Sequence, residues 1–338
     1  MSGIRVMDVT LRDGGCVNDF DFGQEYMNKI LKAQEDARID IIELGYLDDK
    51  DGSSYGRTKF LNEECISESF LKHKADGISY VAMMDYGKFN PDNLKPKSRN
   101  YIDGIRIAFH KKDYIDAIKV SNKILTKGYD LYIQPMITLR YSESELLGLI
   151  DLVNNQLQDA KAFYIVDSFG EMRKQDVIRL WDLVNQNLDE TFEIGFHSHN
   201  NLQLSYSNTM EIINLAGSRN IILDSSIMGM GKGAGNLNTE LLLEHLNINN
   251  GARYHIEPLL KVVDEVVDDL YDKWGWGYAP QYYLSAMNQC TPSYASYFYN
   301  KHTLTIEQIN DLLGRIEETK KISFDKEYAE KLYKAYVE

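Results

Sequence analysis

Residues 4–15, IRVMDVTLRDGG, join a short run of apolar and β-branched residues to a polar cluster that ends in two glycines. The same design, a strand of about five to seven residues and then a longer amphipathic stretch, returns until about residue 250. Strands that are apolar throughout are typical of a parallel sheet covered on both faces. The predicted strands are Ile4–Thr10, Ile39–Gly45, Ile78–Met83, Ile102–Ala108, Leu131–Met136, Ala162–Val166, Phe192–His197 and Ile221–Ser225.

Helical patterns separate these strands. Gln24–Ala37, Ser142–Gln156 and Gln175–Asn187 each carry apolar residues at helical spacing on one broad stripe. Eight strand-and-helix units in order predict an α/β fold, a (β/α)8 TIM barrel, over residues 1–255. A doubly wound open sheet is the competing arrangement, because only the strand count separates the two.

The alternation stops near residue 250, and residues 256–338 are predicted to form a small C-terminal helical domain. Its expected helices are Ile256–Tyr271, Ile306–Lys320 and Lys326–Val337. Between the first two of these lies a segment dense in aromatic residues, from Tyr271 to Tyr299. Core and interface packing is the ordinary role of such residues, and a lid or a dimer interface is the alternative.

Composition excludes several classes of protein. With 37 Lys+Arg and 51 Asp+Glu among 338 residues, the formal net charge is −14, which opposes general binding to nucleic acid or anionic membrane. No apolar run approaches the roughly 18 residues of a membrane-spanning helix, and the first residues lack the layout of a signal peptide. Cys16, Cys65 and Cys290 are odd in number and lack CxxC spacing, so no disulfide framework or zinc ribbon is predicted. A soluble cytoplasmic protein is expected.

Three polar clusters stand at the ends of predicted strands, where barrel enzymes build their active sites. They are Asp8–Gly15 at the first strand, Gly195–Asn201 at the seventh and Asp224–Asn236 at the eighth. These three strands are neighbours in a closed eight-stranded barrel, so their polar residues could converge.

A divalent metal site is the first chemistry that these clusters suggest. His197 and His199 lie two residues apart at a strand end, so both imidazoles point the same way. A lone buried histidine is usually structural, but a pair with a nearby acid favours a metal. With Asp13 and Asn236, the ligands would be two imidazoles, a carboxylate and an amide. That set suits Mn2+, Mg2+, Co2+ or Zn2+, and the sequence does not choose among them.

Arg12 and the glycine-rich run each have two interpretations. Arg12 could form a salt bridge at the barrel rim, or it could neutralise a developing enolate beside a metal. The glycines of residues 229–235 are weak support for phosphate binding, because the Lys-Ser/Thr ending of a P-loop is absent. The preferred interpretation is that these glycines let the backbone approach a ligand or a metal ligand closely. Nucleotide binding is not expected.

Together, the DxTLRDG opening, the HxH of the seventh strand and the GxGxGN after the eighth resemble a known superfamily. This superfamily, which is called hydroxymethylglutaryl-CoA lyase-like, comprises metal-dependent pyruvate aldolases and condensing enzymes with a TIM-barrel fold. Within it, the chain is most similar to the 4-hydroxy-2-oxovalerate aldolases, on Asp224–Asn236, Ile165–Gly170, Arg106–His110 and Gly277–Ala279. The resemblance implies an aldolase that acts on a 2-oxo acid, such as a 4-hydroxy-2-oxo acid, through a pyruvate enolate.

The resemblance also implies residue roles. Asp13, His197 and His199 would bind a divalent metal, Mn2+ or Mg2+ first, with Asn236 as a more distant fourth ligand. Pyruvate would chelate that metal, and Arg12 would stabilise the enolate oxygen. Ser168 and His110 would contact the substrate. Tyr278 would reach it as well, although packing is the more ordinary role of a tyrosine.

One position departs from the aldolase pattern. The aldolases carry their catalytic histidine four residues after the motif arginine, where this chain has Cys16. A thiol could replace that base only if the metal or Arg12 lowered its pKa. A small residue lining the barrel mouth is the alternative role of Cys16.

Two alternative functions stay open. A Claisen-type condensing enzyme using an acyl-CoA usually carries an acid or Gln after RDG, where this chain has Gly15 and Cys16. The coenzyme-A lyases use a cysteine after the eighth strand, and the residues around Ile227 contain none. The second alternative is a metal-binding barrel that has lost catalysis. Expected partners are a small 2-oxo acid, an aldehyde and a second copy in a homodimer. A partner dehydrogenase serves some relatives, but nothing in the sequence indicates one.

Overall fold

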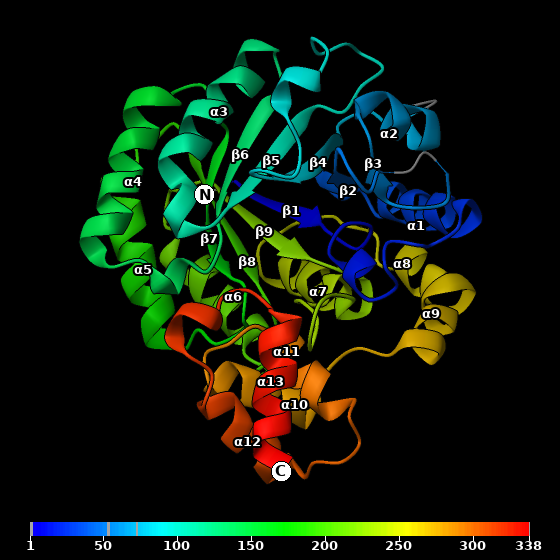
Figure 1. The fold of residues 1–338 in the computed structure, drawn as a ribbon. Coiled ribbons are helices and arrows are strands. Elements are labelled where there is room, and N and C mark those ends of the chain that lie inside the picture. Colours follow the sequence, from blue (N-terminus) through cyan, green and yellow to red (C-terminus); the bar gives the residue numbers. More distant parts are fainter. Residues whose placement is uncertain (1–2, 53–54, 72–73, 338) are drawn as a thin grey trace.

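A computed structural model describes residues 3–52, 55–71 and 74–337. Its centre is a parallel sheet closed into a barrel, because β1 pairs with both β2 and β9 (Figure 1). A two-residue strand, β3 (Lys59–Phe60), extends the sheet beside β2. This arrangement confirms the predicted (β/α)8 TIM barrel and excludes an open sheet. The barrel strands are β1 (Ile4–Asp8), β2 (Ile41–Leu47), β4 (Ser79–Asp85), β5 (Gly104–Phe109), β6 (Asp130–Pro135), β7 (Ala162–Asp167), β8 (Glu193–Ser198) and β9 (Ile221–Ser225).

The strands are apolar on both faces because each face meets a different core. In β1, Val6 points outward into the core between the strands and the helices, and Met7 points inward into the barrel. The interior core also contains Tyr132 and Tyr164, both fully buried. The barrel is therefore packed below its mouth, and open space is confined to one end.

Among the described residues, seven α-helices follow the barrel strands where eight were expected. The connection from β4 to β5 holds only a short 3-10 helix, Pro91–Asn93, so the prediction of eight complete strand-and-helix units is wrong there. Pro91 can begin a helix, but Pro96 lacks the N–H group that a helix continued from Pro91 would need, and buried Phe89 and Leu94 cover the barrel instead. The helices are α1 (Gln24–Asp36), α2 (Glu63–Phe70), α3 (Tyr114–Thr126), α4 (Glu143–Gln156), α5 (Lys174–Asn187), α6 (Ser205–Leu215) and α7 (Thr239–Asn249).

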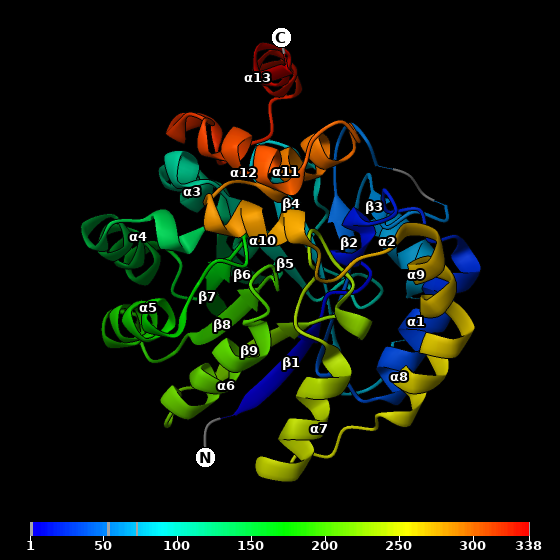
Figure 2. The same cartoon turned by 90° about the horizontal axis from the view of Figure 1, so that it is seen from below.

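The chain after the barrel has two parts. The first is a continuous helical rod of α8 (Glu257–Val262), a π-helical turn (Val263–Val267) and α9 (Asp268–Trp274), which lies alongside α1 (Figure 2). This rod packs into the main core, where it buries Leu259 and Val266.

The second part, residues 280–337, has a core of its own and is called the C-terminal cap below. It consists of α10 (Pro280–Met287), α11 (Pro292–Tyr299), α12 (Ile306–Gly314) and α13 (Lys326–Val337). Tyr294 and Phe298 are fully buried in its core, so packing explains these members of the aromatic segment. The helix expected over Ile306–Lys320 ends at Gly314, because glycine disfavours helix continuation.

No helix of the described residues is long and apolar enough to cross a membrane.

Candidate active site

A cavity of about 670 Å3 opens at the carboxyl ends of the barrel strands. The cap contributes to its wall, so the cavity lies between the barrel mouth and the cap. Its lining includes seven residues expected to act in the site and several that were not expected. The polar side chains of the lining are Arg12, Asp13, Cys16, Tyr46, Asp48, Lys59, Asp85, Tyr86, Lys88, His110, Asp113, Gln134, Ser168, His197, His199, Lys232, Thr291, Ser293 and Ser323.

Asp13, His197 and His199 form a compact cluster at the bottom of this cavity. Their potential ligand atoms all lie within 4.8 Å of one another, and all three residues are buried. His197 belongs to β8 and His199 follows it directly, whereas Asp13 comes from the loop after β1. Barrel closure brings these loops together, since both β1 and β8 pair with β9.

Two buried polar atoms beside this cluster have no hydrogen-bond partner among the described residues. They are His199 Nδ1 and Asn236 Oδ1. The other end of the Asn236 amide is occupied, because its Nδ2 donates to Asp13 Oδ2 over 2.8 Å. Leaving such acceptors unpaired is costly, and a cation would satisfy both. The four residues therefore fit a divalent cation with nitrogen and oxygen ligands.

Electrostatics prepares His199 for the same role. Burial lowers the pKa of His199 to about 4, although Asp13 opposes the shift. The imidazole is therefore neutral at pH 7, which is the form that binds metal ions.

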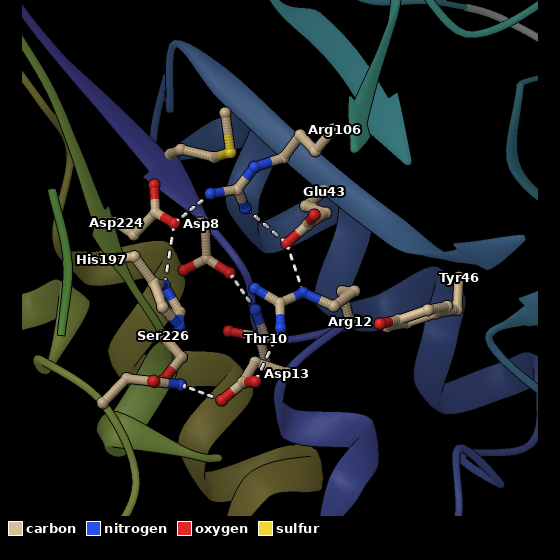
Figure 3. Close-up of polar contacts among 12 residues, drawn as sticks. Asp8, Thr10, Arg12, Asp13, Glu43, Tyr46, Arg106, His197, Asp224 and Ser226 are labelled. Carbon is tan, nitrogen blue, oxygen red and sulfur yellow. Dashed lines mark hydrogen bonds and ion pairs between the residues drawn. The ribbon is translucent and has the colours of Figure 1, made fainter. Parts of the chain in front are cut away.

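A second layer of charges holds His197. Its Nδ1 lies 2.9 Å from Asp224 Oδ2, which leaves Nε2 free for a ligand (Figure 3). A carboxylate behind a histidine fixes the tautomer and orientation of a metal-binding imidazole. Asp224 is held in turn by Arg106, which also donates to Glu43 over 2.7 Å. Burial alone would raise the pKa of Asp224, but Arg106 and His197 outweigh it and lower that pKa.

Arg12 closes this network on the other side. Its Nε donates to Glu43 and its Nη1 donates to Asp13, each over 2.7 Å (Figure 3). Burial alone would lower the pKa of Arg12, but Glu43 and Asp13 outweigh it and raise that pKa above its usual value. Arg12 therefore forms ion pairs, as the salt-bridge interpretation expected. It also lines the cavity, as a role in stabilising an enolate requires.

The motif residues Asp8 and Thr10 brace the loop that carries Arg12 and Asp13. Asp8 Oδ1 accepts the backbone N–H of Thr10, and Asp8 Oδ2 accepts the hydroxyl of Thr239. Thr10 Oγ1 then accepts the backbone N–H of Ile227 over 2.8 Å. The first motif is thus tied to the loop after β9, and its aspartate and threonine position the active-site loop without lining the cavity.

The glycine-rich segment lets the backbone pass close to the cluster. A Cβ on Gly231 would lie 2.3 Å from Asn236 Nδ2 and 2.6 Å from Asp13 Oδ2, too close for any other residue. The glycine therefore permits the close approach of the backbone to Asp13 and Asn236, and the binding of a metal by these two residues stays a prediction.

The remaining expected residues fall into two groups. Cys16, Ser168 and His110 line the cavity, and Ser168 Oγ accepts the backbone N–H of Ile137 over 3.0 Å. Tyr278 lies between α9 and α10 with 59% of its surface exposed, and it is not among the described residues that line the cavity. Its catalytic role stays a prediction that has no contact with the cavity to support it.

Cys16 reaches the cavity, but the surrounding protein keeps its thiol protonated. Although Cys16 is an exposed residue at the cavity, the protein atoms around its thiol and the charge of Asp13 raise its pKa to about 12. At neutral pH this group can donate a hydrogen bond and is a poor base.

A network of buried polar residues inside the barrel was not predicted from the sequence. Glu43 and Arg106 connect the two halves of the network, and Tyr46 donates to Asp85 at the cavity wall. Burial and Asp85 raise the pKa of Tyr46 above its usual value. A signal was present: Glu43 and Arg106 are charged residues in the middle of otherwise apolar strands, and such residues are rarely buried unless paired.

Comparisons with known proteins agree with this geometry. Residues 107–264 match the family model named HMGL-like. A 4-hydroxy-2-oxovalerate aldolase from Geobacillus genomosp. 3 is 31% identical over 278 residues, covering 80% of this chain and 78% of that protein. The aldolase of the same name from Pseudoalteromonas translucida is 29% identical, covering 79% of this chain and 75% of that protein.

Solved structures give the same picture of the fold. The N-terminal domain of a candidate aldolase from Bacteroides vulgatus superposes with a TM-score of 0.72 at 26% identity, covering 87% of this chain and 96% of that one. The hydroxymethylglutaryl-CoA lyase from Pseudomonas aeruginosa superposes with a TM-score of 0.63 at 14% identity, covering 81% of this chain and 95% of that one. The second likeness concerns the fold alone.

Proposed function

Because the chain belongs to the HMGL-like family and is a carbon–carbon lyase, as the 4-hydroxy-2-oxovalerate aldolases are, we propose that it is a divalent-metal-dependent aldolase acting on a 2-oxo acid. It would make or break the bond between the methyl carbon of pyruvate and the carbonyl carbon of an aldehyde. The observation that carries this proposal is the buried cluster of Asp13, His197 and His199 with the Arg12 guanidinium beside it.

Asp13, His197 and His199 would hold the cation, and Asn236 Oδ1 offers a fourth ligand. A bound divalent ion supplies a Lewis acid that stabilises negative charge on a carbonyl oxygen. The likeness to the aldolase family favours Mn2+ or Mg2+ first, and the mixed nitrogen and oxygen donors suit Co2+ and Zn2+ as well.

Arg12 would stabilise the enolate oxygen of pyruvate. Its Nε and Nη1 are used by Glu43 and Asp13, and its Nη2 has no hydrogen-bond partner among the described residues. A guanidinium has five N–H donors, so Nη2 can donate toward the cavity while the rest hold it in place. A fixed donor of this kind lowers the energy of a developing oxyanion, because it does not have to reorient during the reaction.

Ser168 and His110 line the same cavity and would contact the substrate. Ser168 Oγ already accepts one hydrogen bond, so its own proton is free to donate to a carboxylate. Burial lowers the pKa of His110, so its imidazole is neutral at pH 7 and can accept a proton.

Proton NMR of pyruvate in D2O tests this function. The metal-stripped protein is compared with the same sample after addition of catalytic Mn2+ or Mg2+, followed by quenching and chelation. Metal-dependent loss of the methyl signal is the expected result, because formation of the enolate exchanges those protons whatever the aldehyde. A metal-loaded protein that never exchanges them, with or without an aldehyde present, would favour a binding barrel without catalysis.

Assembly and location are also proposed. The chain is expected to be a homodimer in the cytoplasm, and sedimentation at several concentrations measures its assembly.

A further inference from the structure

Lys232 stands out among the lysines that line the cavity. Lys59 is paired with Asp51 over 2.6 Å, and Lys88 with Asp85 over 2.5 Å. Lys232 has no acidic partner among the described residues. An unpaired ammonium on the wall of a cavity attracts an anionic group of a ligand.

The position of Lys232 in the glycine-rich loop puts it between the metal cluster and the cap. The residue before it, Gly231, passes so close to Asp13 that a Cβ would lie 2.6 Å from Asp13 Oδ2. The residue after it, Gly233, passes α11, where a Cβ would lie 3.4 Å from Pro292 Cγ. Lys232 therefore stands where the barrel mouth meets the first turn of α11.

The start of α11 presents further anion-binding groups to the same cavity. Thr291 precedes the helix and Ser293 is in its first turn, and both line the cavity. Thr291 is only 2% exposed, and its hydroxyl makes no capping hydrogen bond to the helix. Thr291 is therefore a buried residue that lines the cavity at the positive end of a helix, and its hydroxyl makes no hydrogen bond to the described residues, so it is suited to an anion.

We propose that the aldehyde taken by this enzyme carries an anionic group, a phosphate or a carboxylate, which binds between Lys232 and the Thr291–Ser293 turn. The inference rests on the proposed aldolase function and adds the class of acceptor. A neutral short aldehyde would leave the lysine and the buried hydroxyl unused, whereas a charged one would satisfy both. The reaction stays balanced: a methyl proton of pyruvate leaves, the carbon–carbon bond forms, and the aldehyde oxygen takes up a proton.

The test measures kcat/KM for aldol addition at saturating pyruvate with four aldehydes. Acetaldehyde and glyceraldehyde are the neutral probes, glyceraldehyde 3-phosphate carries a phosphate, and succinic semialdehyde carries a carboxylate. The wild type should prefer at least one anionic aldehyde over glyceraldehyde by about 30-fold or more, the effect of a charge-assisted hydrogen bond. The preferred probe identifies the anion as phosphate or carboxylate, and equal rates with charged and neutral aldehydes would overturn the proposal.

Two variants assign that preference to this subsite. Lys232→Gln and Thr291→Val should each reduce the ratio of anionic to neutral kcat/KM, mainly through KM for the anionic aldehyde. Lys331→Gln, on the exposed face of α13, is the matched lysine control and should keep the wild-type ratio. A preference that survives in both subsite variants would place the anion elsewhere and contradict the proposal.

Pyruvate methyl exchange in the wild type separates this inference from the function on which it rests. Absence of exchange would count against the aldolase itself, whereas exchange without any preference for charged aldehydes would count against the subsite alone.

Discussion

Arg12 and Asp13 are neighbours in the chain, yet their replacement should have different consequences. Asp13 offers a ligand atom to the metal cluster, whereas Arg12 donates to Asp13 and offers no ligand atom itself. Asp13→Ala or His197→Ala should abolish metal binding and activity together. Arg12→Ala should keep the metal and lose about 100-fold or more in turnover, because a fixed donor to the oxyanion is removed.

Metal content after dialysis and the rate of pyruvate methyl exchange measure the two effects separately. Full exchange activity in Arg12→Ala would show that the enolate assignment is wrong.

Asp224 should matter for metal affinity although it is not a ligand. It lies 2.9 Å from His197 Nδ1 and is charged because Arg106 lowers its pKa. Asp224→Asn removes the negative charge behind the imidazole and should weaken Mn2+ binding by about 10- to 100-fold. Isothermal titration calorimetry with Mn2+ measures this affinity. The control is Asp116→Asn, which removes the charge of an exposed ion pair with Lys119. Unchanged affinity in Asp224→Asn would mean that the network is purely structural.

Cys16 occupies the position of the family's catalytic histidine, but its environment is unsuited to a base. With its pKa raised to about 12 by burial and by Asp13, the thiol stays protonated at neutral pH. Cys16→Ala should therefore keep methyl exchange within about tenfold of the wild type from pH 6 to 9. An exchange rate reduced about 100-fold would restore Cys16 as the base.

At the scale of elements, the glycine-rich loop after β9 is the most constrained segment of the site. Gly231→Ala would push a methyl group into Asn236 and Asp13, so metal affinity should fall by about 100-fold or the fold should be destabilised. Gly148→Ala is the matched control, because Gly148 lies in α4 and a Cβ there meets nothing within 4 Å. It should raise stability slightly, since alanine favours a helix. Metal titration and thermal unfolding of both variants give the comparison, and wild-type metal affinity in Gly231→Ala would contradict the close approach.

Strand and helix patterns were predictable where local periodicity is strong. All eight barrel strands lie where short apolar runs were found, because a strand buried on both faces needs apolar residues throughout. The 3-10 turn between β4 and β5 was missed because the alternation implied a helix there. The connection between these strands has to cover the barrel but does not have to be a helix. Buried Phe89 provides the cover, and Pro96 prevents a longer helix.

At the scale of the whole molecule, Arg140 connects the barrel to the cap, and Glu171 holds Arg140 in place. Arg140 Nη2 pairs with Glu171 over 2.9 Å and also donates to the carbonyl of Gln289 over 3.1 Å. Burial raises the pKa of Glu171 to about 7, with Asp176 adding to the shift and Arg140 and Lys321 opposing it. The folded chain thus holds this proton at pH values where the unfolded chain has released it, so stability falls as pH rises from about 4 to about 7.

Glu171→Gln should lose that part of the pH dependence. Between pH 5 and pH 7.5, the free energy of unfolding of the wild type should fall by roughly 1–3 kcal/mol more than that of the variant. Urea unfolding of both proteins at the two pH values measures these free energies. The same pH dependence in both proteins would show that Glu171 is ionised throughout.

The sequence by itself predicted the barrel, the family and the three residues that the fold brings together, Asp13, His197 and His199. Each of these depends on short-range patterns: apolar strands, two histidines two residues apart, and glycines beside an asparagine. Such patterns can be recognised in the sequence because the backbone geometry of a strand or a tight loop restricts which residues are allowed at neighbouring positions.

Only the tertiary structure decided which charges face one another and what encloses the cavity. Asp13 and Asn236 are 223 positions apart in the chain, and Arg106 and Asp224 are 118 apart, so barrel closure alone brings them into contact. Whether Arg12 is paired, whether Cys16 is protonated and whether Lys232 is free all depend on those contacts. The physical reason is that burial and neighbouring charge set the state of an ionisable group, and neither is encoded within a few residues of it.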